Sequence, residues 1–248
     1  MNKMNIFGEN YAKYYDFMHT NSFYTTLTER LIDKVPPRLM NNSSSILDFG
    51  CGTGNTLAAL KSRGFKNLFG YDVSKEMLSI AQSKLKDVAF YNEYMKLKSS
   101  RFDIIFSLFD VLSYQASDNS LRIYLKQISQ LLTDRGLLIL DGWFANSSEN
   151  APKPTNQNRP FSFFGQKLFR EIKVHELTQF HYTLDLTIKD FNSNVLFSEV
   201  HNLKAYSPSF LGDHFSKIGL ETIEILDAQT FEKLTPDSFR FIMFLKRK

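Results

Sequence analysis

Three glycines and two aspartates form the most informative chemical pattern in this chain of 248 residues. Gly50, Gly52 and Gly54 occupy alternate positions directly after the apolar segment 46–49, and a segment with helical spacing follows them. Glycine permits a tight turn and close approach of a ligand to the backbone, while the start of a helix offers unpaired N–H groups. Asp72 ends the next predicted strand, where a carboxylate can accept two hydrogen bonds from a ribose diol. The spacing therefore predicts a nucleoside site.

The charge of this turn separates the possible ligands. A nicotinamide fingerprint requires a glycine where this chain has Asn55, and a phosphate-binding P-loop requires a lysine at this point of the turn. Asp48 would repel a pyrophosphate and attract a cation. S-adenosylmethionine (AdoMet) carries an ammonium and a sulfonium, so it fits this turn better than a dinucleotide does.

The residues around the turn resemble the class I AdoMet-dependent methyltransferases. The resemblance rests on Asp-Phe-Gly-Cys-Gly-Thr-Gly-Asn at 48–55 and on Gly-Tyr-Asp-Val-Ser at 70–74, followed by Met77, Leu78 and Ala81. It implies that Asp48 and the glycines hold the methionine part, that Asp72 binds the ribose, and that Val73 and Met77 flank the adenine. Asn92, followed by Glu93, stands where an acidic residue usually meets the adenine amino group. The full set expected at the cofactor is Tyr11, Tyr15, Asp48, Gly50, Cys51, Gly52, Asp72, Val73, Met77, Asn92, Glu93 and Ser107.

Three further segments are similar to the bacterial N,N-dimethyltransferases of nucleotide-linked amino sugars. They are residues 107–114, Asp-Gly-Trp-Phe at 141–144, and Glu-Val-His at 199–201. Those enzymes place a Tyr or His at the position of Tyr114, beside the transferred methyl, and an Arg before the final strand, where this chain has Arg240. They have a Glu-Pro-Trp-Trp-like stretch in place of residues 141–144. The resemblance implies a catalytic role for Tyr114 and an acceptor contact from Arg240. His201 and Tyr15 are further catalytic candidates, because they are expected within reach of the carboxyl edge of the sheet, and Tyr14 and Trp143 are further candidates to contact the acceptor.

Alternating strands and helices position these residues. From residue 46 onward, short apolar strands alternate with segments of helical spacing, a rhythm typical of a parallel sheet with helices on both faces. The strands are expected at 46–49, 67–71, 88–91, 102–108 and 137–140, with two more at 221–226 and 239–245. The prediction is an α/β fold with a Rossmann-like, mostly parallel sheet of seven strands, as in the family it resembles.

Two segments fall outside this rhythm. Residues 1–40 are aromatic and helical, and residues 143–160 are rich in Asn, Ser and Pro, which indicates a loop. Residues 167–206 alternate as three antiparallel strands, which we expect to form a small lid. The predicted division is therefore an N-terminal helical lid (1–40), an AdoMet-binding domain (41–142 and 207–248) and a β insertion (143–206) that covers the substrate.

Composition limits the partners. The net charge of +4 is spread along the chain, which gives no reason to expect a nucleic-acid partner. No apolar run is long enough for a signal peptide or a membrane span, and the lone Cys51 excludes an internal disulfide, so we expect a cytoplasmic protein. Asp141 has no second and third ligand at suitable spacing, so we expect no metal. Exposed lid strands could pair two chains into a homodimer.

The sequence leaves several functions open. Methyl transfer to a small amine is the first, because a neutral amine needs only a weak base nearby. Small-molecule O-methylation uses the same fold. Nucleic-acid methylation is disfavoured, because the Ser-Leu-Phe-Asp of 107–110 lacks the proline pair of amino-methyltransferases and the only cysteine lies in the glycine turn. A non-catalytic AdoMet-binding module is the fourth. Tyr114 and Trp143 could equally be packing aromatics, and His201 could face solvent.

Overall fold

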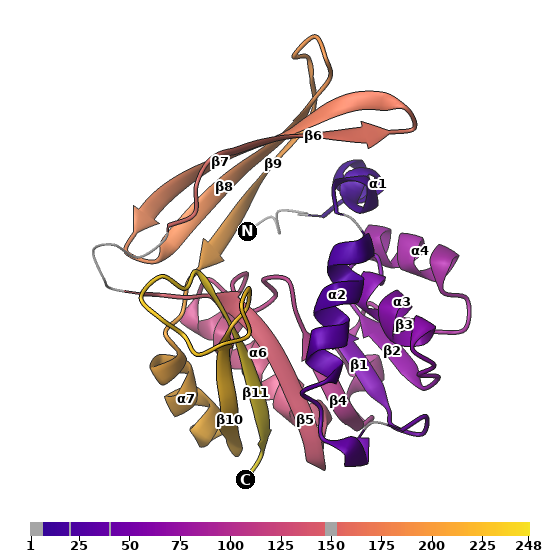
Figure 1. Ribbon diagram of the computed structural model, residues 1–248, viewed down its shortest axis with the longest axis vertical. Coiled ribbons are helices and arrows are strands. Elements are labelled where there is room, and N and C mark those ends of the chain that lie inside the picture. The colour runs from indigo at the N-terminus through magenta and orange to yellow at the C-terminus, as the bar shows by residue number, and fades with distance from the viewer. Residues whose placement is uncertain (1–6, 20, 40, 147–152) are drawn as a thin grey trace.

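The computed structural model describes residues 7–19, 21–39, 41–146 and 153–248. A wide sheet with helices on both faces carries a second sheet above one end (Figure 1). The strands of the wide sheet are β1 (Ile46–Phe49), β2 (Leu68–Tyr71), β3 (Ala89–Tyr91), β4 (Phe102–Ser107), β5 (Leu132–Trp143), β10 (Leu220–Asp227) and β11 (Arg240–Arg247). Its helices are α3 (Asn55–Ser62), α4 (Lys75–Lys84), α5 (Tyr94–Leu97), α6 (Asp118–Leu131) and α7 (Pro208–Lys217).

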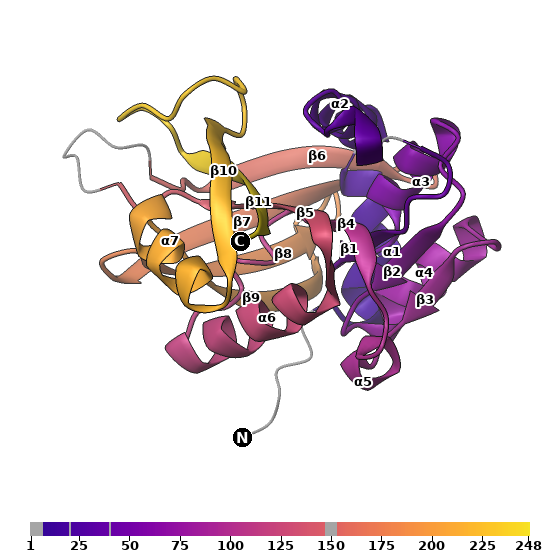
Figure 2. The ribbon, with the colours of Figure 1, turned by 90° about the horizontal axis from the view of Figure 1, so that it is seen from below.

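The order of the wide sheet is β10-β11-β5-β4-β1-β2-β3, and β11 alone runs opposite to the other strands. Two apolar clusters cover its faces. One contains side chains of α6 and α7, and the other contains side chains of α3, α4 and α2 (Asn21–Ile32) (Figure 2). All four residues of β1 are buried, as expected for a central parallel strand enclosed on both faces. The predicted fold class is confirmed.

The second sheet contains four antiparallel strands, so the prediction of three is wrong. They are β6 (Gln157–Phe163), β7 (Gln166–Thr178), β8 (His181–Lys189) and β9 (Val195–Lys204), in that spatial order. β6 begins inside the segment predicted as a loop and contains Pro160. A proline is tolerated there because β6 is an edge strand. Phe161 and Phe163 of β6 pack against Tyr14 of α1 (Glu9–Met18), which lies beneath this sheet (Figure 1).

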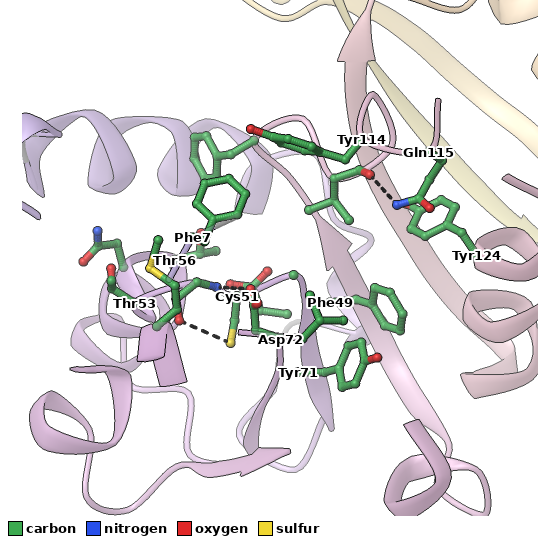
Figure 3. A pocket seen from close by; sticks show the side chains of 18 of the residues that line it. Phe7, Phe49, Cys51, Thr53, Thr56, Tyr71, Asp72, Tyr114, Gln115 and Tyr124 are labelled. Atoms are coloured by element: carbon green, nitrogen blue, oxygen red, sulfur yellow. Dashed lines mark hydrogen bonds between the residues drawn. The ribbon is translucent and has the colours of Figure 1, made fainter. Parts of the chain in front are cut away.

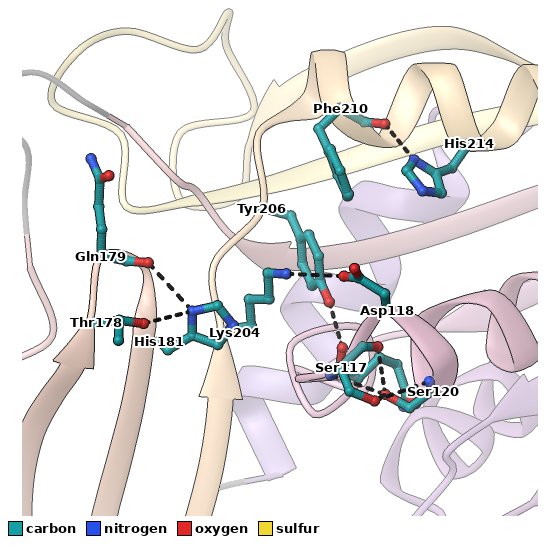
Figure 4. Close-up of polar contacts among 11 residues, drawn as sticks. Ser117, Asp118, Ser120, Thr178, Gln179, His181, Lys204, Tyr206, Phe210 and His214 are labelled. Carbon is teal, nitrogen blue, oxygen red and sulfur yellow. Dashed lines mark hydrogen bonds and ion pairs between the residues drawn. The ribbon is translucent and has the colours of Figure 1, made fainter.

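Side-chain caps begin two of the helices next to the site. The Oγ of Ser74 accepts a hydrogen bond from Met77 N (3.1 Å) and so caps α4. At α6 the cap is Ser117, whose Oγ accepts from Ser120 N (3.1 Å), and Asp118 is the first helical residue (Figure 4). Asp118 lies 3.6 Å from Lys204 Nζ at the end of β9. The base of the lid sheet is therefore held against the start of α6.

Candidate active site

The glycine turn lies at the carboxyl end of β1, which neighbours β4 in the sheet. Ligands of open α/β sheets bind at such a point, because the connections leave it on opposite faces. Figure 3 shows Cys51 of this turn among the side chains that line the adjoining pocket. Gly50 has φ +90°, and a Cβ at this residue would lie 2.3 Å from Val111 Cγ2. The turn therefore requires glycine here, both for its backbone conformation and for the packing of the loop after β4.

Two carboxylates flank the turn, Asp48 buried and Asp72 half-buried. Asp72 Oδ2 accepts a hydrogen bond from Gly52 N and Oδ1 accepts one from Ser74 N, both at 2.8 Å. Burial raises the pKa of Asp72, while these backbone donors oppose the shift. Burial, and to a lesser extent the charge of Asp72, raises the pKa of Asp48 to about 8. A cationic ligand would relieve the cost of ionising both groups.

A cavity of about 520 Å³ opens beside the turn, within the size range of small-molecule sites. Among the described residues that line it, Asp48 and Asp72 are the only charged side chains. Nine of the residues predicted for the site line this cavity: Tyr15, Asp48, Gly50, Cys51, Gly52, Asp72, Val73, Met77 and Tyr114. The lining is otherwise mostly aromatic or apolar, so the cavity suits a ligand with a flat base and a positive charge.

Tyr114 connects the cavity to the lid sheet. Its Oη lies 2.9 Å from His201 Nδ1, and His201 Nε2 lies 2.8 Å from Glu199 Oε1. The second contact is off the line of a good hydrogen bond, and both of its atoms are buried. Glu199 Oε2 also accepts from the backbone N–H of Phe7 (3.3 Å), whose ring packs edge-on against Tyr114 and His201. His201 is buried, so the alternative that it faces solvent is wrong.

Comparison with known sequences decides the family. The profile of the family described as a methyltransferase domain matches residues 11–225. This chain belongs to that family. A putative methyltransferase of Geobacillus sp. (strain WCH70) is 31% identical over 139 residues, which cover 54% of this chain and 56% of that protein. The chain thus spans about half the length of the curated relatives that it matches.

Solved structures share the whole architecture of this methyltransferase. The CcbJ methyltransferase from Streptomyces caelestis superposes with a TM-score of 0.76 at 16% identity, covering 97% of each chain. CalS10 from Micromonospora echinaspora, an amino pentose methyltransferase solved with bound AdoMet, gives 0.72 at 18% identity, covering 98% of this chain and 99% of that one. At these identities the likeness establishes the fold.

AdoMet is the cofactor of this methyltransferase, and the cavity fits it. The site combines a glycine turn of open backbone, two carboxylates, aromatic rings and no lining cation among the described residues. Tyrosine and phenylalanine faces attract a sulfonium, and carboxylates attract an ammonium. When bound, AdoMet supplies an activated methyl group. Positioning of the acceptor then supplies most of the rate.

Several predicted site residues lie outside the cavity. Ser107 is buried below it, where its Oγ donates to Phe49 O (3.0 Å) and accepts from Tyr124 Oη (2.9 Å). Tyr11 lies behind Tyr15, with its ring 5.9 Å from that ring. Tyr14, Asn92 and Glu93 do not line the cavity: Tyr14 packs against the lid sheet, and Asn92 and Glu93 lie just before α5, Glu93 on the surface. Trp143 packs between Tyr182 and Phe239.

Arg240, the predicted anchor for the acceptor, is held by two acids of the methyltransferase. Its Nη2 lies 2.6 Å from Asp141 Oδ2 and 2.9 Å from Asp110 Oδ1. Burial alone would lower the pKa of Arg240, but the charges of Asp110 and Asp141 raise it. Asp141 Oδ1 also accepts from Asp110 N (3.1 Å). The two acids together neutralise the charge of Arg240, next to the loop that carries Tyr114.

Sequence reasoning missed one wall of the cavity. Ser120, Ile123, Tyr124 and Gln127 of α6 all line it. They recur at i, i+3, i+4 and i+7, the spacing of one helical face, so the signal was present in the sequence. Tyr24 and Phe109 are further lining aromatics, and Phe109 has φ +62° in the loop after β4.

Helix α1 is fastened to the glycine turn by one acid. Asp16 Oδ1 accepts from Thr53 Oγ1 (2.6 Å) and from Asn55 Nδ2 (3.0 Å), and Asp16 Oδ2 lies 2.7 Å from Lys84 Nζ. Asn55, which argues against a nicotinamide fingerprint, thereby ties the N-terminal helix to the turn. The contacts place Tyr15, the residue directly before Asp16 on α1, at the cavity.

None of the described helices is long and apolar enough to cross a membrane. No group of three or more His, Cys, Asp or Glu side chains suited to a metal ion occurs within the described ranges.

Proposed function

We propose that this methyltransferase methylates the amine nitrogen of a small molecule, with an amino sugar as the acceptor class. The observation that carries the proposal is the series of Tyr114, buried His201 and Glu199, which reaches the cavity through Tyr114. An amine nucleophile is already strong when neutral, so it requires a proton acceptor of only modest strength. A hydroxyl acceptor would need a stronger base.

The contacts of His201 set the direction of proton transfer in this proposal. Because a carboxylate oxygen lies 2.8 Å from Nε2, that nitrogen carries the proton, and Nδ1 accepts from the hydroxyl of Tyr114. Burial raises the pKa of Tyr114 well above its ordinary value, so the phenol stays protonated. As the N–C bond forms and the C–S bond breaks, with its electron pair going to sulfur, the amine proton passes to Tyr114 Oη. The phenolic proton passes to His201 Nδ1, beside the charge of Glu199.

Roles for the other residues follow from their positions. We assign the methionine part of AdoMet to Asp48 and the glycine turn, and the ribose to Asp72, whose oxygens keep lone pairs free after their backbone contacts. Tyr15 lines the cavity and accepts a hydrogen bond from Tyr24 Oη (3.2 Å), which makes it a second polar contact for the acceptor. The likeness to an amino pentose methyltransferase supports an amino sugar as the acceptor.

The arrangement of the chain fits this function. We propose that residues 1–40 and 143–206 enclose the acceptor against the AdoMet-binding domain formed by 41–142 and 207–248. The outer edges of β6 and β9 are unpaired among the described residues, which supports a homodimer through the lid sheet. A single buried cysteine supports a cytoplasmic location.

A matched substrate panel tests the acceptor class. Nucleotide-linked amino sugars, their hydroxyl analogues and free small amines are each incubated with AdoMet, and S-adenosylhomocysteine formation is followed. We expect turnover with the amines and none with the matched hydroxyl compounds. Methylation of the hydroxyl analogues alone would assign the enzyme to O-methylation. AdoMet binding without turnover on any compound would contradict both assignments.

A further inference from the structure

Three basic side chains meet where α1 lies under the lid sheet. Arg159 of β6 and Arg170 of β7 are directly opposite each other in the register of the two strands. Arg170 Nη1 lies 3.5 Å from Nε2 of His19, the residue that follows α1. The cluster draws on two strands and a helix end, so only the folded chain brings it together.

Among the described residues no acid forms an ion pair with Arg159 or Arg170, although the charge of Asp16 acts on His19. Like charges directly opposite each other destabilise an antiparallel pair. The described ion pairs include neither Arg159 nor Arg170, and the side-chain contacts of Arg170 are long, 3.5 Å to His19 and 3.3 Å to Gln157 Oε1. Burial lowers the pKa of Arg170, and Arg159 adds to this effect. Burial and the charge of Arg170 lower the pKa of His19 to about 4. An anion would relieve these costs together.

The cluster adjoins the site. The ring of His19 lies 4.6 Å from the ring of Tyr15, which lines the cavity. Arg170 pairs with Ile188, which in turn pairs with Phe197 of β9. Phe197, Glu199 and His201 are alternate residues of β9, so they share one face of the sheet with Arg170. The face that delivers His201 to Tyr114 therefore also carries the two arginines.

We infer that Arg159 and Arg170 form a subsite for a phosphoryl group carried by the acceptor. This inference rests on the proposed function, because it describes the acceptor of that same site. Guanidinium groups present fixed forks of donors that match phosphoryl oxygens, and two of them can share one phosphoryl group. Arg240 is already neutralised by Asp110 and Asp141, whereas Arg170 keeps unpaired donors.

Binding of inorganic pyrophosphate tests the subsite without any turnover. Calorimetry at low ionic strength is run on the wild type, Arg170→Gln and Arg159→Gln, with and without saturating AdoMet. Lys167→Gln is the matched control, because Lys167 is exposed on the same strand and points to the opposite face. We expect each arginine variant to weaken pyrophosphate binding about tenfold or more and the lysine variant to change it less than twofold.

Other outcomes would overturn the inference. One is that the wild type binds no pyrophosphate at all, and a second is that Lys167→Gln weakens pyrophosphate binding as much as the arginine variants do. A third is that malonate binds more tightly than pyrophosphate, which would assign the arginines to a carboxylate. Loss of AdoMet affinity in Arg170→Gln with pyrophosphate binding intact would assign them to the cofactor. As a second measurement, pyrophosphate should raise the pKa of His19 from about 4 in the NMR titration of the wild type. Arg159 is exposed, so its variant keeps the test valid if Arg170→Gln does not fold. If pyrophosphate does not bind at the arginines but the enzyme still methylates amines, the subsite is wrong and the proposed function stands.

Discussion

Asp48 should release a proton when AdoMet binds. Its carboxyl is buried and its pKa is raised to about 8, so about nine in ten Asp48 side chains hold a proton at neutral pH. The ammonium and sulfonium of AdoMet favour the ionised form, so the complex should lose up to about 0.9 proton from this group near pH 7. Below a pH of about 8, AdoMet affinity should then rise by close to tenfold per pH unit, and above it the rise should level off.

The same group should affect the stability of the free enzyme in the opposite direction. The folded-state pKa of Asp48 lies above the value of 3.8 for an exposed aspartate, so the folded chain binds more protons than the unfolded chain between these values. Stability from this group is complete below a pH of about 4 and is lost as pH rises toward 8. Even one unit of this shift corresponds to about 1.4 kcal/mol. The variant Asp48→Asn should therefore be more stable than the wild type at a pH near 8, yet bind AdoMet more weakly.

Calorimetry in two buffers of different ionisation enthalpy measures the proton release. The α-ammonium of AdoMet titrates in the same pH range, so the difference between the wild type and Asp48→Asn isolates Asp48. S-adenosylhomocysteine, which lacks the sulfonium charge, should release fewer protons from the wild type. Equal proton release by the wild type and Asp48→Asn, or an affinity independent of pH below 8, would refute this account of Asp48.

Four further substitutions test the site. Tyr114→Phe should lower kcat by about a hundredfold with AdoMet affinity unchanged, and Glu199→Gln should change the pH profile of kcat through His201. Steady-state kinetics with an accepted amine measure both effects. Undiminished turnover in Tyr114→Phe would remove its role in proton transfer. Gly50→Ala should cost roughly 3 kcal/mol in urea unfolding, because of its φ of +90° and the Val111 contact. Gly165→Ala is its control, with φ +85° and no atom near the added Cβ, so equal losses would show that the Val111 contact is unimportant. Asp16→Ala should weaken AdoMet binding about tenfold by freeing α1 from the glycine turn, and an unchanged affinity would show that this link does not position the cavity wall.

The lid sheet shows why part of the fold could not be predicted from the sequence. β7, β8 and β9 alternate along their length and were predicted, whereas β6 contains Pro160 and follows a polar stretch, so its local pattern indicates a loop. What makes it a strand is the pairing with β7 and the packing of Phe161 and Phe163 on Tyr14. The contacts with Tyr14 join residues more than 140 positions apart, and no local pattern encodes them.

Local chemistry in the sequence determined the glycine turn, Asp48, Asp72 and the parallel sheet that carries them, because a turn and its two flanking strands are close in the chain and their residue types are fixed by backbone conformation and charge. Only the tertiary structure decided that His201 is buried against Tyr114 and that Glu199 completes the series. It also decided that Arg240 forms ion pairs while Arg170 contacts a neutral amide. Whether a side chain has a partner depends on groups brought from distant strands, and burial then sets its charge.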